Sequence, residues 1–393
     1  MRGGQSKELD KWTAGCVEGR WCTLGPYYAM FPIQFARSVI ERFCPEDGVI
    51  LDPFCGRGTV PYIAMVSGKR SIGCDINPIA WLYSKTKTDP HRRHEDVLAR
   101  LRDVERAVRP SDCKAENEFQ KWAWSSRVLG FLNAARRELN WSDHKADRTL
   151  LGIMLGYVHA KRGGGLSNQL RQSKAMAPEY AVRWWKARRL SPPDLDPVEF
   201  LSARVKWRYA KGLPPGAGQP VIYREDAGRI LNRRVDLPKA DLVFTSPPYR
   251  GVTNYQYDNW IRLWVAGRGP ALPISTTEQR YEDTKRYEKM LSAVFDAANA
   301  RAKRSAIFYV RTYADPTTLL PTVNVLVALL KGRRGYLRQA GFPLPTQTAL
   351  FGDQATKPGD VDLLFAPDGV SIPRGFCGME SRTALTIMAT SGH

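Results

Sequence analysis

Two predicted strands end on acidic side chains, and a glycine loop follows the first of them. The apolar run 49–51 predicts a short buried strand that ends on Asp52. The loop Pro53-Phe54-Cys55-Gly56-Arg57-Gly58 then leads to a helix predicted from about Thr59 to Ser67. Glycines let the backbone approach a ligand, and the start of a helix offers free N–H groups. The loop lacks a Gly-Lys-Ser/Thr ending and the third glycine of a dinucleotide loop, so taken alone it could serve only the geometry of the turn.

Asp75 ends the second predicted strand, 70–75. A carboxylate at this point of an α/β sheet suits hydrogen bonds to the ribose hydroxyls of a nucleoside cofactor. Its alternative role is to shape the turn toward Asn77-Pro78. Because two acids and a glycine loop stand at successive strand ends, a nucleoside-containing cofactor is favoured.

Thr245-Ser246-Pro247-Pro248-Tyr249 ends another predicted strand, 241–245. Successive prolines donate no N–H and fix a rigid turn with outward-facing carbonyl acceptors. Ser246 adds an acceptor and Tyr249 adds a flat ring. Rigid acceptors beside a stacking surface suit a planar ring that carries an amine, such as an unstacked nucleobase. The alternative is a structural proline turn with a packed tyrosine, which its coincidence with the Asp52 loop disfavours.

These segments require a parallel sheet, because several strand ends then meet at one edge. A helix is predicted over 32–43, and strand, loop, helix, strand and helix follow in the pattern of a parallel α/β unit. Further strands are predicted at 221–223, 241–245, 305–310, 346–351 and 361–365, with a helix near 287–301. We therefore expect a loose arm over 1–20, a Rossmann-like α/β domain over 21–90 and 218–370, a largely helical inserted module over 91–217, and a tail over 371–393.

The chain is strongly basic. Its 393 residues include 59 Lys and Arg against 39 Asp and Glu, which gives a net charge of +20. This excess implies a polyanionic partner, nucleic acid first and an anionic membrane surface second, although a solvated basic surface is also compatible with it. The N-terminus lacks the apolar run of a signal peptide, and no apolar stretch reaches the roughly 18 residues of a membrane span. We expect a soluble protein that is not exported.

The cysteines and histidines give no metal-binding pattern. Seven cysteines are scattered and never spaced Cys-x-x-Cys, which argues against a disulfide framework or a zinc ribbon. Five histidines are equally dispersed, and His91-Arg92-Arg93-His94 is better explained as a basic loop than as a ligand pair. We therefore expect no metal.

The inserted module is the predicted reader of a nucleic-acid target. From Lys161 to Leu190 eight basic residues stand against one acid, Glu179, and aromatic residues are interleaved with them. This mixture suits phosphate contacts combined with stacking, although Trp184 and Trp185 could equally belong to a helical core. Residues 163–169 predict a flexible loop from which Asn168 and Gln169 could read base edges. The candidate nucleic-acid-binding residues are Lys161, Arg162, Asn168, Gln169, Arg171, Lys174, Arg183, Lys186, Arg188 and Arg189.

The Asp52-to-Thr59 loop, taken together with Thr245-Ser246-Pro247-Pro248-Tyr249, resembles the DNA amino-methyltransferases, which use S-adenosylmethionine. Residues 28–31 and the helix from Pro32 look like the family segment that closes over the methionine part of the cofactor. Residues 72–78 resemble the ribose-binding strand end, and 224–227 resemble the segment that contacts adenine. The resemblance implies a Rossmann-like methyltransferase fold. The cofactor-binding residues that it implies are Tyr28, Phe31, Pro32, Asp52, Pro53, Phe54, Cys55, Gly56, Gly58, Thr59, Asp75, Ile76, Asp226, Ala227 and Thr245.

Serine before Pro-Pro-Tyr resembles the subgroup that methylates the N4 amine of cytosine, whereas the adenine-N6 subgroup more often carries Asp or Asn there. The resemblance therefore implies catalytic roles for Ser246, Pro247, Pro248 and Tyr249 on a cytosine flipped out of duplex DNA. No cysteine follows a proline in the chain, which argues against the covalent thiolate mechanism of cytosine-C5 enzymes.

Three alternatives stay open: a DNA adenine-N6 methyltransferase, an RNA amino-methyltransferase, and a non-catalytic DNA-binding protein on the same scaffold. The intact acids Asp52 and Asp75 and the intact 246–249 turn argue against the last of these. The resemblance also implies a cytoplasmic protein encoded by a prokaryote or a phage, with a cognate restriction endonuclease as a candidate second partner.

Overall fold

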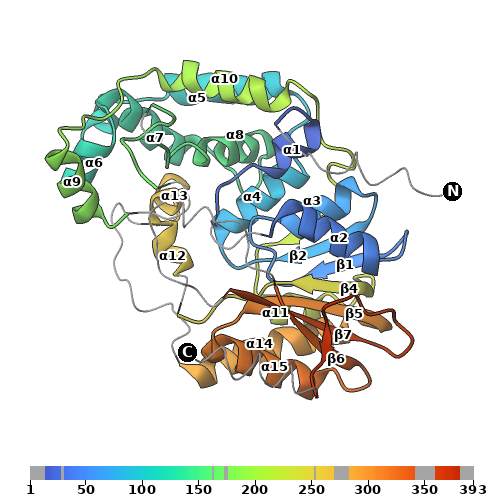
Figure 1. Ribbon diagram of the computed structural model, residues 1–393. Coiled ribbons are helices and arrows are strands. Elements are labelled where there is room, and N and C mark those ends of the chain that lie inside the picture. Colours follow the sequence, from blue (N-terminus) through green and yellow to red (C-terminus); the bar gives the residue numbers. More distant parts are fainter. Residues whose placement is uncertain are drawn as a thin grey trace.

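A mixed eight-stranded sheet forms the centre of the computed structural model, which describes residues 14–27, 31–161, 163–171, 176–251, 254–269, 283–340 and 359–380 (Figure 1). The order across the sheet is β3-β2-β1-β4-β5-β7-β6-β8. The strands are β1 (Val49–Asp52), β2 (Arg70–Cys74), β3 (Val221–Tyr223), β4 (Ala240–Thr245), β5 (Ala302–Tyr313), β6 (Arg334–Gln339), β7 (Asp360–Ala366) and β8 (Cys377–Gly378). The helices beside them are α1 (Val17–Cys22), α2 (Ile33–Phe43), α3 (Thr59–Val66), α4 (Pro78–Thr88), α11 (Ala227–Arg233), α14 (Thr284–Ala300) and α15 (Pro316–Leu329).

The first five strands run parallel, so their carboxyl ends share one edge. β7 runs antiparallel between β5 and β6, and therefore begins at the edge where β1 to β5 end. The order of the chain reverses between β1 and β4, with β2 and β3 on one side and β5 on the other. Ligands of open α/β sheets bind at such a reversal, outside the carboxyl ends of the strands.

Helices cover both faces of the sheet, which explains why its central strands are uninterrupted apolar runs. α2 and α3 pack on one face, and α11, α14 and α15 on the other (Figure 1). Alternation along the strands divides them between the two cores: Ile50 and Leu242 belong to one, and Leu51 and Val243 to the other. The predicted Rossmann-like class, with a mostly parallel sheet interrupted by a helical segment, is confirmed.

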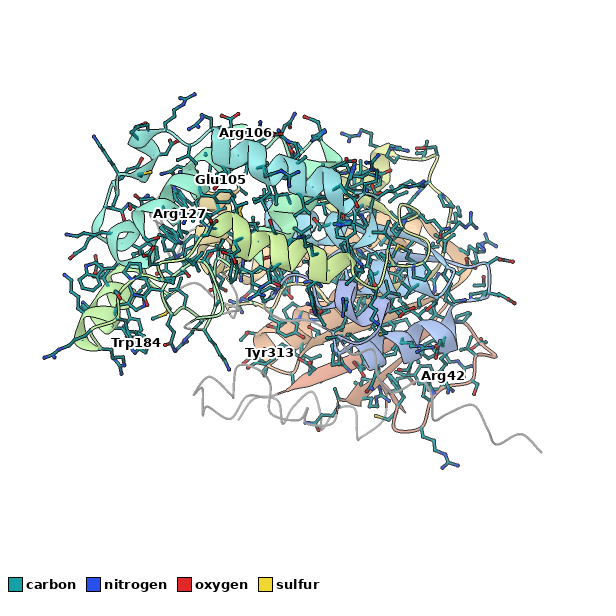
Figure 2. The ribbon with its side chains drawn as sticks, turned by 90° about the horizontal axis from the view of Figure 1, so that it is seen from above. Arg42, Glu105, Arg106, Arg127, Trp184 and Tyr313 are labelled. Atoms are coloured by element: carbon teal, nitrogen blue, oxygen red, sulfur yellow. The ribbon has the colours of Figure 1, made fainter. Side chains whose placement is uncertain are left out.

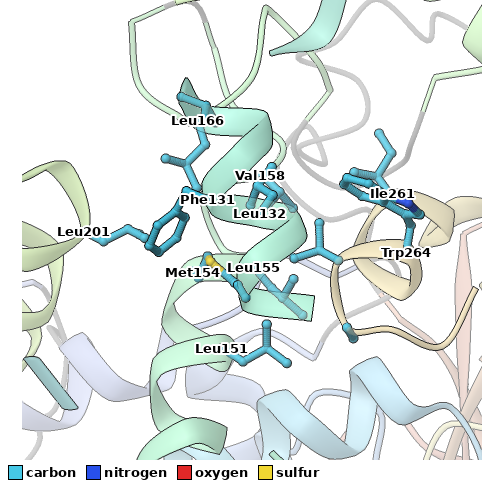
Figure 3. Packing of buried hydrophobic residues seen from close by; sticks show 14 of the residues in the cluster. Phe131, Leu132, Leu151, Met154, Leu155, Val158, Leu166, Leu201, Ile261 and Trp264 are labelled. Carbon is cyan, nitrogen blue, oxygen red and sulfur yellow. The ribbon is translucent and has the colours of Figure 1, made fainter. Parts of the chain in front are cut away.

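The interruption is a helical layer that shares a core with α4. Its helices are α5 (His94–Arg106), η1 (Pro110–Cys113), α6 (Glu118–Ala123), α7 (Ser126–Glu138), α8 (Lys145–Leu155), α9 (Pro178–Ala187) and α10 (Pro197–Tyr209). Figure 3 shows Leu151, Met154 and Leu155 of α8 gathered in this core with Phe131 of α7. α8 also lies close to α4, because a Cβ at Gly152 would stand only 2.2 Å from the Thr86 Oγ1 atom. The layer is thus packed against α4.

Two short helices beyond Tyr249, α12 (Tyr255–Asp258) and α13 (Trp260–Val265), connect the sheet to this layer. Trp264 stacks on Trp124 with ring centroids 4.9 Å apart, and Ile261 lies in the same core (Figure 3). The predicted α/β domain, 21–90 and 218–370, includes the residues of α13. Sequence periodicity does not show which core a short apolar helix joins. The chain therefore passes from the Pro-Pro-Tyr turn directly into the helical layer.

The strand predictions differ from the structure in two places. β6 was not predicted, because Gly335 and two arginines break its apolar alternation. The strand predicted at 346–351 lies outside the described residues. Within the described ranges, no helix combines the length and the apolar character needed to cross a bilayer.

Candidate active site

The ends of β1 and β4 are tied together where the chain order reverses. The Thr245 hydroxyl donates to the Asp52 Oδ1 atom at 2.6 Å, and the Phe54 N–H donates to the same atom at 3.3 Å. Asp52 is only 2% exposed, and its burial raises its pKa to about 7 although both hydrogen bonds lower it. Asp52 is thus a carboxyl that gains or loses its charge near neutral pH and responds to a cationic ligand group.

Asp75 holds the glycine loop in place. Its Oδ2 atom accepts the Gly56 N–H at 2.9 Å, and its Oδ1 atom accepts the Asn77 N–H at 2.8 Å. Burial raises the pKa of this half-buried carboxyl to about 6, against the two backbone hydrogen bonds. Asp75 therefore shapes the turn toward Asn77, which is the alternative role expected from the sequence. Each of its carboxyl oxygens also keeps a lone pair that can accept a hydrogen bond from a ligand hydroxyl.

Gly56 and Gly58 both have a left-handed backbone, with φ of +50° and +78°. A Cβ at Gly58 would stand 2.2 Å from the Ser84 Oγ atom of α4. At Gly56 the nearest atom to such a Cβ would be Tyr27 Cε1, at 3.9 Å. Gly58 therefore lets α4 pack against the start of α3, while Gly56 leaves the space beside the loop open.

Replacing Gly58 with alanine is expected to lower the free energy of unfolding by about 1–3 kcal/mol, because left-handed strain and a clash with Ser84 act together. Urea unfolding followed by circular dichroism measures the change. Gly68→Ala is the matched control, since Gly68 has φ +72° but no atom within 4 Å of the added Cβ. Equal losses in the two variants would exclude a contribution from the Ser84 contact.

Tyr249 is fixed by contacts from β5 and β7. Its hydroxyl donates to the Asp360 Oδ1 atom at 3.0 Å, and its ring stacks on Tyr313 with centroids 5.3 Å apart and 11° between the planes. Burial and the neighbouring Asp360 carboxyl raise the pKa of Tyr249 well above its usual value, so Tyr249 is a neutral phenol.

The two proline carbonyls of the turn differ in their partners. Tyr287 of α14 donates its hydroxyl proton to the Pro248 carbonyl at 2.9 Å. No donor from the described part of the chain is paired with the Pro247 carbonyl. Sequence reasoning missed Tyr287, Tyr313 and Asp360, since nothing in their spacing links them to the turn. Their signal is topological: Tyr313 ends β5 and Asp360 begins β7, opposite each other.

Three further cofactor candidates lie around the loop. Ile76 is 62% exposed directly after Asp75, and an exposed apolar side chain there suits a flat ring. Phe31 stacks on Phe244 with centroids 4.8 Å apart, and Pro32 is exposed at the start of α2. Tyr28 lies outside the described residues. Of these candidates, Ile76 gives the loop an exposed apolar side chain on the side of β2.

The remaining candidates are engaged within the protein. Asp226 lies after β3 at the same sheet edge, but its Oδ1 atom accepts the Arg229 N–H at 3.0 Å and so caps α11. Ala227 is buried in the first turn of that helix. Phe54 is half-buried and packs edge-on against Phe295 of α14. Cys55 is buried, and burial raises the pKa of its thiol well above the usual range. Pro53 and Thr59 are also buried, on either side of the glycines.

Several predicted nucleic-acid contacts gather at the α9 end of the helical layer, where Figure 2 labels Trp184. Arg183, Arg188 and Arg189 are exposed, and the Arg188 guanidinium lies 4.3 Å from the Trp184 ring centroid. Lys186 is exposed as well but forms an ion pair with Glu118. Lys161 and Arg171 are also exposed, whereas Arg162 and Lys174 lie outside the described residues.

The prediction that Asn168 reads a base edge is wrong, because its side chain lies in the core. It is 2% exposed, and its amide donates to the carbonyls of Trp122 at 3.1 Å and Leu190 at 3.3 Å. The neighbouring Leu166 is buried and draws this segment inward, so the loop is not the exposed reader that its glycines predicted. Gln169 is half-buried. Trp185 is fully buried, so the core alternative holds for that residue.

The described residues contain no cluster of three or more His, Cys, Asp or Glu side chains suited to a metal ion. The acids at the sheet edge are paired instead with backbone N–H groups and hydroxyls, as described for Asp52 and Asp75. These carboxyl oxygens are hydrogen-bond acceptors, which suits an organic ligand that carries hydroxyl and amino groups.

Comparison with known proteins identifies the N-terminal part of the chain most clearly. Residues 4–85 match the family model described as N6_N4_Mtase, DNA methylase. A segment of 49 residues is 49% identical to the Type II methyltransferase M.ScaI of Streptomyces caespitosus, and this match covers 12% of the chain and 16% of that relative.

Similar solved structures include two rRNA methyltransferases. A putative rRNA-methylase of Clostridium thermocellum is 10% identical, with a TM-score of 0.32 over 85% of this chain and 96% of that one. The rRNA methyltransferase aviRa of Streptomyces viridochromogenes is 14% identical, with a TM-score of 0.33 over 92% and 94%. Similarity at this level says nothing about substrate, and the fold stands on the strand order described above.

Proposed function

We propose, from the match of residues 4–85 to the DNA methylase family model, that this chain transfers a methyl group from S-adenosylmethionine to an exocyclic amine of duplex DNA. The target atom that we favour is cytosine N4, with adenine N6 second. One observation carries the proposal: the Thr245 hydroxyl donates to Asp52, which couples the amine-accepting turn directly to the glycine loop. One short hydrogen bond therefore joins the segment proposed to bind the cofactor to the segment proposed to bind the base.

The residues at the sheet edge fit the cofactor that this family uses. Asp52 offers a carboxyl to a cationic amino group, Asp75 offers acceptors to ribose hydroxyls, and exposed Ile76 offers an apolar surface to adenine. Gly56, with no side chain, leaves room for a ligand beside the loop. The cofactor supplies an electrophilic sulfonium methyl group.

The turn provides the base side of the reaction. The amine lone pair of cytosine is delocalised into the ring, so the amine is a weak nucleophile. Acceptors at Ser246 and at the Pro247 carbonyl would bind its two N–H groups, draw the nitrogen toward tetrahedral geometry and localise the lone pair. Most of the rate enhancement then comes from positioning two reactants, and no strong base is needed because the methylated amine loses a proton readily.

The preference for cytosine rests on the size of the acceptor at position 246. Serine is short and neutral, and with the Pro247 carbonyl it suits an amine on a small pyrimidine ring. Tyr249 would contribute a ring that stacks on the flipped base. Since Tyr249 already stacks on Tyr313, its orientation is set before a base arrives.

Analysis of the methylated nucleosides tests the proposal. The chain is incubated with isotope-labelled S-adenosylmethionine and either duplex DNA or RNA, and each nucleic acid is digested to nucleosides for mass spectrometry. N4-methylcytosine from DNA is the expected product. Finding only N6-methyladenine would overturn the choice of cytosine as the target base and would leave the proposed amine methylation standing. Finding label only in RNA would overturn the proposal that DNA is the substrate. Cofactor binding without any methylation would favour the non-catalytic alternative.

DNA binding is expected to depend steeply on salt through the exposed cations near α9. Changing Arg183, Lys186, Arg188 and Arg189 together to Gln should flatten the slope of log affinity against log salt, by roughly 0.9 for each lost phosphate contact. The contribution of Lys186 should be smaller, because it is paired with Glu118. Fluorescence anisotropy at several salt concentrations measures the slope.

The matched control for this experiment removes four exposed cations at the opposite, amino edge of the sheet. These residues are Arg42, Arg304, Lys331 and Arg334. Arg42 and Trp184 lie at opposite ends of the molecule in Figure 2. Equal slopes in the two quadruple variants would show that the α9 cations form a solvated surface without a specific role.

A further inference from the structure

Two exposed arginines, Arg224 and Arg268, form an arginine pair at the edge of the sheet where β1 to β5 end. Arg224 directly follows β3, and the carbonyl of Tyr223 before it accepts the Asp75 N–H at 3.1 Å. Arg268 lies just after α13, the helix into which the chain passes beyond the Pro-Pro-Tyr turn. The arginine pair therefore lies close to the residue that is proposed to bind the ribose.

One serine hydroxyl holds the two guanidinium groups together. The Ser142 Oγ atom accepts a hydrogen bond from Arg268 Nη2 at 3.2 Å and another from Arg224 Nη1 at 3.5 Å. The two nitrogen atoms are therefore no farther apart than the sum of these distances. Because two like charges at this separation repel each other, an anion that contacts both of them would be bound favourably.

Two tryptophan rings support the guanidinium groups. The Arg224 guanidinium lies 5.4 Å from the Trp81 ring centroid and 5.3 Å from that of Trp141, and the Arg268 guanidinium lies 5.1 Å from the Trp141 centroid. Each indole N–H donates to a backbone carbonyl, at 3.1 Å in β3 for Trp81 and at 3.0 Å at the end of α13 for Trp141, so both rings are fixed. A guanidinium that rests on an aromatic ring keeps N–H donors in its own plane for a ligand.

The charge of the arginine pair is not balanced by an ion pair within the described part of the chain. A third arginine beside Trp81, Arg148, has the Asp89 carboxyl 4.0 Å away, whereas no described carboxyl forms an ion pair with Arg224 or Arg268. Burial lowers the pKa of Arg224, the Arg268 charge lowers it further, and the Asp143 charge raises it. Arginine nevertheless keeps its proton at neutral pH, so the pair presents two positive charges.

We propose that the arginine pair binds a phosphate group of the DNA backbone at the edge of the sheet where the base is proposed to bind. The proposal rests on the proposed function, since it takes duplex DNA as the substrate. A phosphodiester carries one negative charge on two non-bridging oxygens, so it can accept N–H groups from both guanidinium groups at once. Such a contact reads no sequence, and it fixes the position of the duplex on the protein.

The test removes both charges of the arginine pair in the full chain. The double variant Arg224→Gln/Arg268→Gln is compared with wild type on a DNA duplex that the wild-type chain methylates, by fluorescence anisotropy at several salt concentrations. The slope of log affinity against log salt should flatten by roughly 0.9, the value for one phosphate contact. The matched control, Arg42→Gln/Arg304→Gln, removes two exposed arginines at the amino edge of the sheet and should keep the wild-type slope.

A second double variant separates phosphate binding from a structural role. Arg224→Lys/Arg268→Lys keeps both charges but loses the planar guanidinium groups, so it should keep most of the salt slope that the Gln variant loses. Equal flattening in the Lys and Gln variants, or a wild-type slope in the Gln variant, would overturn the phosphate site. A raised KM for S-adenosylmethionine with a wild-type salt slope would assign the pair to the cofactor instead. If the wild-type chain methylates no DNA duplex, the proposed function itself is overturned, so the two failures are distinct.

Discussion

Replacing Ser246 with alanine is expected to lower turnover by about ten- to a thousandfold, the scale of losing one positioned group that acts in the transition state. The affinity for S-adenosylmethionine should barely change, because the role proposed for Ser246 is to bind the base, whereas its neighbour Thr245 donates to Asp52, which is proposed to bind the cofactor. Single-turnover methylation measures the first quantity, and calorimetry measures the second. The combination separates a residue that acts on the amine from one that shapes the cofactor site.

Ser38→Ala is the matched control, since Ser38 lies on the exposed side of α2 and its hydroxyl donates only to the Phe35 carbonyl. Thermal unfolding of both variants shows whether folding is affected. A Ser246→Ala variant with wild-type turnover would remove Ser246 from the reaction and leave the Pro247 carbonyl as the acceptor of the turn. A parallel fall in stability and turnover would indicate a structural role for the hydroxyl.

The sequence was informative where a local pattern of residues is enough to determine the local structure. Apolar runs that end on Asp52, Asp75 and Thr245 could be predicted as parallel strand ends, and parallel ends meet at one edge. The glycines at 56 and 58 also follow a local rule, because both have positive φ. The hydrogen bond between Thr245 and Asp52 is the direct consequence of placing β1 beside β4.

What the sequence did not predict depends on contacts between distant segments. Asp360 could not be linked to Tyr249 without knowing that β7 runs antiparallel and begins at the edge where β1 to β5 end. Asn168 looked like an exposed polar residue after three glycines, but the burial of Leu166 takes its amide into the core. Trp264 belongs to the helical layer only because it stacks on Trp124, a partner 140 positions away. Tertiary packing decides all three, and single-sequence periodicity carries no record of it.

Asp52 makes the stability of the ligand-free chain depend on pH. In the folded chain its pKa is raised to about 7 by burial, whereas an unfolded chain ionises this carboxyl near its usual value. The folded state therefore binds the proton more tightly, and the free energy of unfolding falls as the pH rises between about 4 and 7. A shift of about three pKa units at 1.36 kcal/mol each corresponds to about 4 kcal/mol. A cationic ligand group beside Asp52 would recover this energy by stabilising the carboxylate.

Replacing Asp52 with asparagine should therefore stabilise the ligand-free chain relative to wild type, increasingly from pH 4 to pH 7, and weaken S-adenosylmethionine binding at the same time. Asparagine keeps an acceptor for Thr245 and Phe54 but has no charge to bury. Urea unfolding at a series of pH values gives the difference between the two chains, with Asp47→Asn at an exposed carboxyl as the control. Parallel stability curves for wild type and Asp52→Asn would mean that the folded chain ionises Asp52 as easily as the unfolded one. Stabilisation together with lost cofactor binding would show that this carboxyl is retained for its ligand at the expense of the fold.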